Sequence, residues 1–225
     1  MNLVAVETAT EACSVAVSIN GEIIEQFRLC PNGHSQHILA MVEQVLSEAG
    51  LTLSQCDVLA FGKGPGSFTG LRIGAGVIQG MAFGADLPVV AVSSLAALAQ
   101  RQGVGAVLAA FDARMGQVYW GPYRRVSSGL MSPCAEERVS APQDVHVPVD
   151  SATWLGAGSG WDRFGEQLRA GLGEACRGWV ADAFPHAEDV ARIALELAGS
   201  GQALPAEQAL PSYIRDDVAR KSPGR

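Results

Sequence analysis

The chain has 225 residues, a formal net charge of −7 and 48% hydrophobic residues. This length allows one large domain or two small ones with a well-buried core. The acidic balance argues against binding nucleic acid alone, because neutralising phosphate groups requires a basic surface. No stretch approaches the ~20 apolar residues of a membrane span, so we expect no membrane association.

The five cysteines are odd in number and never form a C-x-x-C pair. The start of the chain has no basic region and reaches Glu7 early, which is not the pattern of a signal peptide. We therefore expect reduced cysteines and a cytoplasmic protein. The tail is locally basic, and it is either solvated or in contact with an acidic partner; it holds Arg215, Arg220, Lys221 and Arg225 against Asp216 and Asp217.

The first part of the sequence predicts a sheet followed by a helix. Three apolar runs, with a hairpin signal at Asn20-Gly21, predict a three-stranded antiparallel meander over residues 3–6, 13–19 and 22–29. Residues 34–49 change to helical spacing, and Gly50 ends the helix. One apolar stripe runs along this helix, formed by Ile38, Met41, Val42, Val45, Leu46 and Ala49.

A strand, a glycine-rich loop and a helix follow over residues 56–84. This order aims backbone N–H groups at an anion, so one interpretation is a phosphate or carboxylate site formed by Gly64, Gly66 and Ser67. The loop matches neither a P-loop, nor a dinucleotide fingerprint, nor a nucleophile elbow, because its glycine and lysine positions differ from all three. The other interpretation is a tight turn in which Ser67 caps the helix.

The helix predicted over residues 67–84 carries Gly76, Gly80 and Gly84 at intervals of four, which places them on one face. Each glycine costs a helix about 1 kcal/mol relative to alanine, so the repetition calls for a compensating contact. Close approach of another helix is the usual one, either from a partner or from within the chain.

The second half repeats the alternation of strands and helices. We predict strands at 89–92, 104–111 and 117–123, a strand with a second glycine loop (Gly156 and Gly158) at 154–160, and helices at 93–101, 159–170 and 187–198. Residues 127–151 are rich in Ser, Pro and charge and predict loops. We therefore expect two related α/β subdomains, residues 1–102 and 103–225, with the basic tail packing back on the first.

Few side chains group into a chemical site. Glu7, Thr8 and Thr10 follow the first strand, where they could hold a magnesium-nucleotide phosphate or form a capped turn. His34 and His37 lie three apart at a helix start, and a polar helix terminus explains them at least as well as a metal site. No Ser-His-Asp trio can be assembled, so we expect neither a catalytic residue nor a metal in this chain.

Five stretches together resemble the bacterial TsaB (YeaZ) family: the opening hairpin 4–16, the helix start 34–39, the glycine loop 64–74, the turn 112–119 and the tail 213–219. They span nearly the whole chain, and their combination is highly specific. The resemblance implies an α/β fold of the actin/hexokinase/Hsp70 type, with two lobes and a cleft between them. It also implies the dimerisation subunit of the machinery that forms threonylcarbamoyladenosine (t6A) in tRNA.

The resemblance further implies the partners. The catalytic subunit of the family's complex is a paralogue, TsaD, while TsaE is an ATP-hydrolysing partner and TsaC makes the threonylcarbamoyl-adenylate. We expect a heterodimer with TsaD, a homodimer when the chain is alone, and contact with tRNA through the assembled complex only. The chain itself would require no cofactor, with ADP or ATP expected at the interface of the complex.

Two departures bear on mechanism. ATPases of this fold place an aspartate at the end of the first strand, where this chain has the longer Glu7, so we expect no nucleotide hydrolysis. The paralogue's metal-binding histidines are four apart on one helix, whereas His34 and His37 are three apart.

We therefore expect a non-catalytic scaffold that uses helices 34–49 and 67–84 to bind its partner, through Ile38, Leu39, Met41, Val42, Val45, Leu46, Gly76, Gly80 and Gly84. The alternative is an enzyme acting alone. It would be either a nucleotide hydrolase using Glu7, Thr8 and the glycine loops, or a peptidase, as the family's former glycoprotease label suggests.

Overall fold

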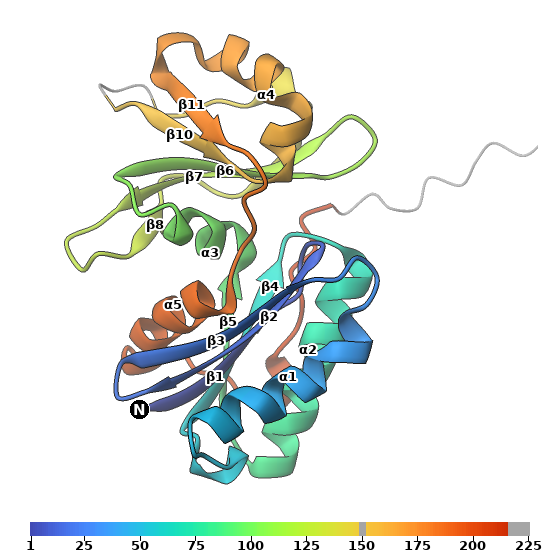
Figure 1. Cartoon of the computed structure of the whole chain (residues 1–225). Coiled ribbons are helices and arrows are strands. Elements are labelled where there is room, and N and C mark those ends of the chain that lie inside the picture. The colour runs from blue at the N-terminus through green and yellow to red at the C-terminus, as the bar shows by residue number, and fades with distance from the viewer. Residues whose placement is uncertain (149–151, 216–225) are drawn as a thin grey trace, which may run out of the picture.

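The computed structural model describes residues 1–148 and 152–215 as two α/β lobes, one above the other in Figure 1. Each lobe is built on one sheet, and helices cover the faces of both sheets. Among the described helices, none is both long and apolar enough to cross a membrane.

The first lobe contains a five-stranded sheet in the order β3-β2-β1-β4-β5. The first three strands form the expected antiparallel meander, and β4 and β5 add in parallel beside β1. Because side chains alternate along a strand, Val4 and Val6 pack with α1 and α2, whereas Leu3 and Ala5 pack with α3 and α5. The elements are β1 (Asn2–Glu7), β2 (Ala12–Ile19), β3 (Glu22–Leu29), α1 (His34–Glu48), β4 (Val58–Gly64), α2 (Phe68–Ala85), β5 (Val89–Ser93) and α5 (Ala187–Gly199).

The second lobe repeats this plan in the order β8-β7-β6-β10-β11. Its first three strands are antiparallel, β10 and β11 are parallel to β6, and a short strand β9 pairs with β7. The elements are α3 (Ser94–Arg101), β6 (Ala106–Asp112), β7 (Val118–Arg125), β8 (Met131–Pro133), β9 (Arg138–Ser140), β10 (Trp154–Ala157), α4 (Ser159–Leu172) and β11 (Cys176–Val180). The repeated order confirms the two-lobed α/β fold of the actin/hexokinase/Hsp70 type.

Helix α3 lies between the two sheets and joins the lobes (Figure 1). Its first turn is held from both sides, because Ser94 Oγ donates to Glu7 of the first lobe and Ser93 Oγ donates to Glu137 of the second. Helix α5, although late in the chain, packs on β1 and β2 of the first lobe. The division at residue 102 stays a prediction, but the packing of α5 ties the end of the chain to its beginning.

The last described residues run back along the first lobe and reach the second. Leu204 pairs with Val89 at the edge of the first sheet, and Ser212 N donates to the Lys63 carbonyl at 2.8 Å. Arg215 then donates to the Gln117 side chain at the start of β7. Three basic residues of the predicted tail, Arg220, Lys221 and Arg225, lie outside the described residues.

Most predicted helices and strands are confirmed within a few residues, but two regions differ. Residues 127–151, expected as loops, contain β8 and β9, and strand β11 was not predicted at all. Strands β8 and β9 are only three residues long, which is too short for an alternating hydrophobic pattern to be recognised in the sequence. β11 contains an arginine and a glycine, and the parallel partner β10 holds it in place.

Candidate functional site

The glycine loop between β4 and α2 is packed against the chain's own first turn. Ser67 Oγ accepts a hydrogen bond from Gly70 N at 3.3 Å, so Ser67 caps α2. Ser67 N in turn donates to the Ala9 carbonyl at 2.7 Å. A Cβ added to Gly66 would overlap the Ala9 carbonyl, and one added to Gly70 would overlap the Thr8 carbonyl. Backbone of the first turn therefore fills the inner side of the loop, and the other side of residues 66–70 faces the cleft described below.

The start of α2 continues the same contact. Thr8 Oγ1 donates to the Gly70 carbonyl at 2.9 Å, and a Cβ on Gly74 would overlap that hydroxyl. At the end of β4, Gly64 has φ +102° and lies against Leu71, so it serves the turn. The structure thus favours the capped-turn interpretation for Thr8, Gly64 and Ser67.

Glu7 is an internal link and not a surface group. Its side chain is buried, with Oε1 accepting from Ala9 N and Oε2 accepting from Ser94 Oγ, each at 2.7 Å. A Cβ on Gly62 would overlap this carboxyl group, so β4 needs glycine there. Burial raises the pKa of Glu7, and the hydrogen bonds from Ala9 and Ser94 partly offset that rise. Glu7 therefore joins β1, β4 and α3 and does not line the cleft described next.

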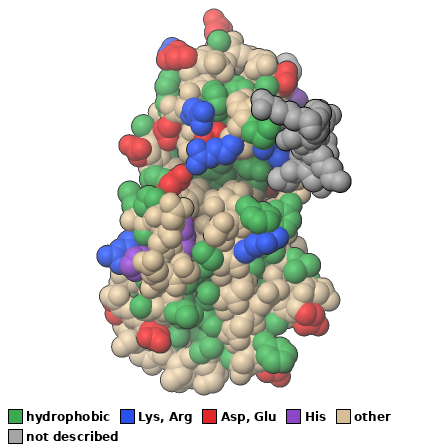
Figure 2. All heavy atoms as spheres, turned by 90° about the vertical axis from the view of Figure 1, so that its right-hand side faces the viewer, with side chains coloured by type: hydrophobic (Ala, Val, Ile, Leu, Met, Phe, Trp, Pro, Cys, Tyr) green, Lys and Arg blue, Asp and Glu red, His purple; other side chains and the backbone are tan. Residues whose placement is uncertain are grey.

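A cleft of about 600 Å³ lies between the lobes. Of the predicted residues, Thr10, Gly66 and Ser67 line it, whereas Glu7, Thr8, Gly64, Gly156 and Gly158 do not. Its other wall comes from the second lobe and the end of the chain, with Asp112, Arg114, Met115, Tyr119, Ser159 and Arg215. Figure 2 views this side and shows basic side chains above and below the waist between the lobes.

Asp112 and Arg215, two charged residues of the cleft, each contact neighbouring side chains. Asp112 Oδ2 lies 2.7 Å from Arg163 Nη1 and 3.5 Å from Arg114 Nη1. The Arg215 guanidinium lies over the Tyr119 ring, 6.0 Å from its centre. Because Asp112 and Arg215 come together only through the fold, sequence reasoning placed neither in a site, although the turn 112–119 was one of the resembling stretches.

The second glycine loop serves packing in the upper lobe. A Cβ on Gly156 would overlap the Trp161 ring, and one on Gly158, where φ is +101°, would overlap the Ala110 carbonyl. Gly158 comes directly after β10 and Gly64 is the last residue of β4, so both lobes place a glycine with positive φ at the turn from the parallel strand into the next helix.

The two histidines of α1 lie in different environments. His34 is buried, and its Nε2 lies 2.9 Å from the Thr10 carbonyl and 3.1 Å from that of Ala12. His37 is beside Arg28, with Nδ1 3.2 Å from the guanidinium. His34 thus holds the turn after β1, and the described residues bring together no group of three or more side chains suited to a metal.

The outer face of α1 and α2 is the second candidate site. Gly76, Gly80 and Gly84 are exposed, and a Cβ added to any of them would meet no atom within 4 Å. On the same two helices, Phe83 of α2 is 86% exposed and Leu39 of α1 is 55% exposed. No atom of the described residues covers the three glycines, and no charged residue occurs in α2 between Ile73 and Ala85.

The predicted partner surface needs one correction. The apolar stripe of α1 faces the sheet, because Ile38, Met41, Val42 and Val45 are buried in the core of the first lobe. They fill the space between α1 and the strands and are not available to a partner. The accessible part of the predicted set consists of Leu39, half-buried Leu46 and the three glycines.

Comparison with known proteins decides the family. The chain is 41% identical over 235 aligned residues to the tRNA threonylcarbamoyladenosine biosynthesis protein TsaB of Escherichia coli K12, covering 100% of both chains. The chain belongs to the TsaB family. The protein of the same name from Haemophilus influenzae is 36% identical and covers 100% of this chain and 98% of the relative.

Solved structures and a family model agree with this assignment. YeaZ from Pseudomonas aeruginosa superimposes with a TM-score of 0.88 at 45% identity, covering 94% of this chain and 99% of that one. Residues 28–153 match the family model described as "TsaD: tRNA N6-adenosine threonylcarbamoyltransferase". The resemblance drawn from five sequence stretches is confirmed.

Proposed function

We propose that this chain is a non-catalytic subunit of the machinery that forms t6A in tRNA, and that the outer face of α1 and α2 binds the catalytic subunit. The family assignment supports the pathway, since its relatives are named for threonylcarbamoyladenosine biosynthesis. The match of residues 28–153 to the TsaD family model supports a kinship between this chain and TsaD, the partner that we propose.

The state of Glu7 supports a non-catalytic role. A carboxylate that binds a metal-nucleotide must reach the ligand, but this one is buried and accepts hydrogen bonds from Ala9 and Ser94. The inner side of the glycine loop packs against the backbone of Thr8 and Ala9, and Ser67 N donates to the Ala9 carbonyl. The chain uses both features to hold its first lobe together.

The observation that carries the proposal is the open glycine face of α2. Three exposed glycines lower helix stability by about 1 kcal/mol each relative to alanine, and no contact with another described residue offsets that cost. A second helix can approach such a face closely, and Phe83 and Leu39 supply apolar area beside it. Binding of TsaD in a heterodimer, or of a second copy when the chain is alone, would use this surface.

The other partners follow from the family and complete the proposal. TsaE joins the assembled complex, TsaC supplies the threonylcarbamoyl-adenylate, and tRNA binds through the complex. ADP or ATP lies at the interface of the complex and is not a cofactor that this chain requires.

An omission experiment tests the proposal. The chain, TsaD, TsaE and TsaC are purified and combined with tRNA, ATP, threonine and bicarbonate, leaving out one protein at a time. We expect t6A formation in the full mixture, loss of it when the chain is omitted, and neither t6A formation nor ATP turnover by the chain alone. ATP or peptide hydrolysis by the chain alone, lost on Glu7→Gln, would favour the hydrolase alternative.

A further inference from the structure

The end of the described chain, residues 204–215, runs along the first lobe and is called the strap below. Its start is fixed to β5, because Leu204 N and Val89 N each donate to the carbonyl of the other residue at 2.8 Å. Farther along, Gln79 of α2 donates through Nε2 to the Ala209 carbonyl at 3.1 Å. Ala209 itself is fully buried in the core of the first lobe. The strap is therefore anchored on the first lobe before it reaches the cleft.

The last residues of the strap pass from one lobe to the other at the cleft. The Tyr213 hydroxyl accepts a hydrogen bond from Arg72 Nε of α2 at 3.2 Å, and the Tyr213 ring lies 5.6 Å from that of Phe68. Two residues later, Arg215 lines the cleft and donates through Nη2 to the Gln117 side chain of the second lobe. The strap therefore connects α2 with the turn between β6 and β7.

The turn that receives the strap has an unusual backbone. Arg114 and Met115 have φ values of +62° and +53°, a region that residues other than glycine rarely adopt. Ala113 N donates to the Gln117 carbonyl at 2.9 Å and closes the turn. Met115 Sδ accepts from Arg215 Nη1 at 3.6 Å. The turn thus holds two acceptors, one on Met115 and one on Gln117, where a single guanidinium reaches both.

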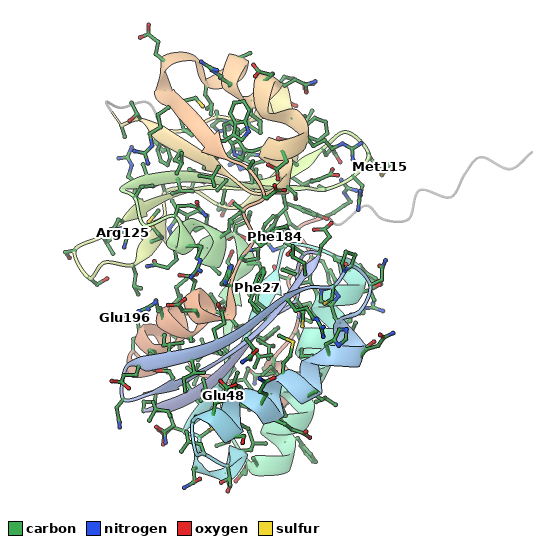
Figure 3. All side chains as sticks on the ribbon, in the orientation of Figure 1. Phe27, Glu48, Met115, Arg125, Phe184 and Glu196 are labelled. Carbon is green, nitrogen blue, oxygen red and sulfur yellow. The ribbon has the colours of Figure 1, made fainter. Side chains whose placement is uncertain are left out.

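The lobes are joined in a different way on the other side of the molecule. Leu3 of the first sheet and Val107 of the second belong to one hydrophobic cluster, which also contains buried residues of α3 and α5. Figure 3 shows Glu196 of α5 at one edge of the molecule and Met115 at the opposite edge. Apolar packing therefore joins the lobes on one side, the polar contacts of the strap join them on the other, and the cleft lies between the lobes on the side of the strap.

We propose that the strap holds the two lobes closed over the cleft, and that release of Arg215 from Gln117 lets them open. The packed side near α3 and α5 would act as the hinge, because sliding the lobes there would expose buried apolar surface. Opening at the cleft requires only that the contacts of one guanidinium are broken, and such contacts contribute little net free energy. This device goes beyond the function proposed above and does not rest on it.

Single-molecule energy transfer between two dyes, one on each lobe, tests the proposal in the full-length chain. The dyes are attached at Gln36→Cys of α1 and Glu166→Cys of α4, which are exposed helical positions. Cys134 and Cys176 are replaced by serine, and the other three cysteines are buried. Picomolar concentration keeps the chain monomeric, so the transfer efficiency reports the separation of the lobes within one molecule.

The parent should show one narrow population, which is the closed form. Arg215→Ala should add a population with lower transfer efficiency, at least about fivefold more abundant than in the parent. Gln117→Ala, on the other lobe, should have the same effect, and the double variant should add nothing further because both changes remove one contact. Arg114→Ala is the matched control and should leave the distribution unchanged, because Arg114 is in the same turn but pairs with Asp112.

Either of two results would overturn the proposal. If Arg215→Ala and Gln117→Ala both keep the distribution of the parent, the packed side alone holds the lobes. If Arg114→Ala changes the distribution as much as they do, the turn matters and the strap does not. The three variants change side chains that are not buried, so all should remain folded, and circular dichroism with a melting curve checks this.

Discussion

Helix α2 carries glycines on two sides, and the two sets differ in what lies against them. Gly70 and Gly74 face inward, where a Cβ would overlap the backbone or hydroxyl of Thr8. Gly76, Gly80 and Gly84 face outward and meet nothing within 4 Å. The inner set is required by the fold, whereas no contact among the described residues requires glycine at the outer positions. The contrast separates residues that shape the protein from residues that are free to meet a partner.

A substitution in the inner set of glycines should cause the largest change in the free energy of unfolding. Gly70→Ala drives a methyl group into the Thr8 carbonyl, which is backbone and cannot move aside. We expect a loss of about 3 kcal/mol or more in the free energy of unfolding, measured by urea denaturation. A loss below about 0.5 kcal/mol would mean that the turn and the helix are not in contact as described.

Glu7 lies on the same inner side, and its substitution should cause the second-largest loss in the free energy of unfolding. Glu7→Gln keeps the size and can still accept from Ala9 N, but its NH2 group then faces Ser94 Oγ, which must accept a hydrogen bond and loses the acceptor for its own proton. We expect a loss of about 1–3 kcal/mol in the free energy of unfolding. Unchanged stability together with lost nucleotide turnover would instead place the carboxylate in a catalytic site.

Thr8 tests one hydrogen bond of the same contact. Thr8→Val keeps the shape and removes the bond from Oγ1 to the Gly70 carbonyl, which is 2.9 Å long and buried. We expect a loss of about 1 kcal/mol in the free energy of unfolding, again by urea denaturation. Thr10 lines the cleft and serves as the comparison. Thr10→Val should lower the free energy of unfolding by less than Thr8→Val does.

A substitution in the outer set of glycines should cause the smallest change in the free energy of unfolding, and this change should be a gain. Gly80→Ala adds a methyl group in open space and removes backbone freedom from the unfolded chain. We expect a gain of up to about 1 kcal/mol in the free energy of unfolding, shown by a higher melting temperature. A loss of stability would mean that a neighbouring part of the chain covers this face.

Much of this architecture could be predicted from the sequence, because local patterns determine it. The alternating run around Asn20-Gly21 predicted the meander, and the glycine spacing predicted that three glycines share one face of α2, which the structure shows to be exposed. The stripe of α1 predicted a helix correctly, but amphipathic spacing does not say whether the apolar side meets the core or a partner. Burial of Ile38 and Val45 shows that it meets the core.

The candidate sites were harder to predict, since they depend on contacts between distant residues. Asp112 and Arg215 are far apart in sequence and meet at the cleft only after folding. Glu7 looked like a ligand because it ends a strand, and only its bond to Ser94 of α3 shows that it is internal.

The most direct test of the account is the affinity of the catalytic subunit for two matched variants. Gly80→Leu and Gly171→Leu each put a bulky side chain on an exposed helical glycine, the first on the outer face of α2 and the second on α4. Titration with TsaD should show binding weakened by about tenfold or more for Gly80→Leu and unchanged for Gly171→Leu, with both variants folded. Equal affinity for the two variants would contradict the claim that the outer face of α1 and α2 binds the partner.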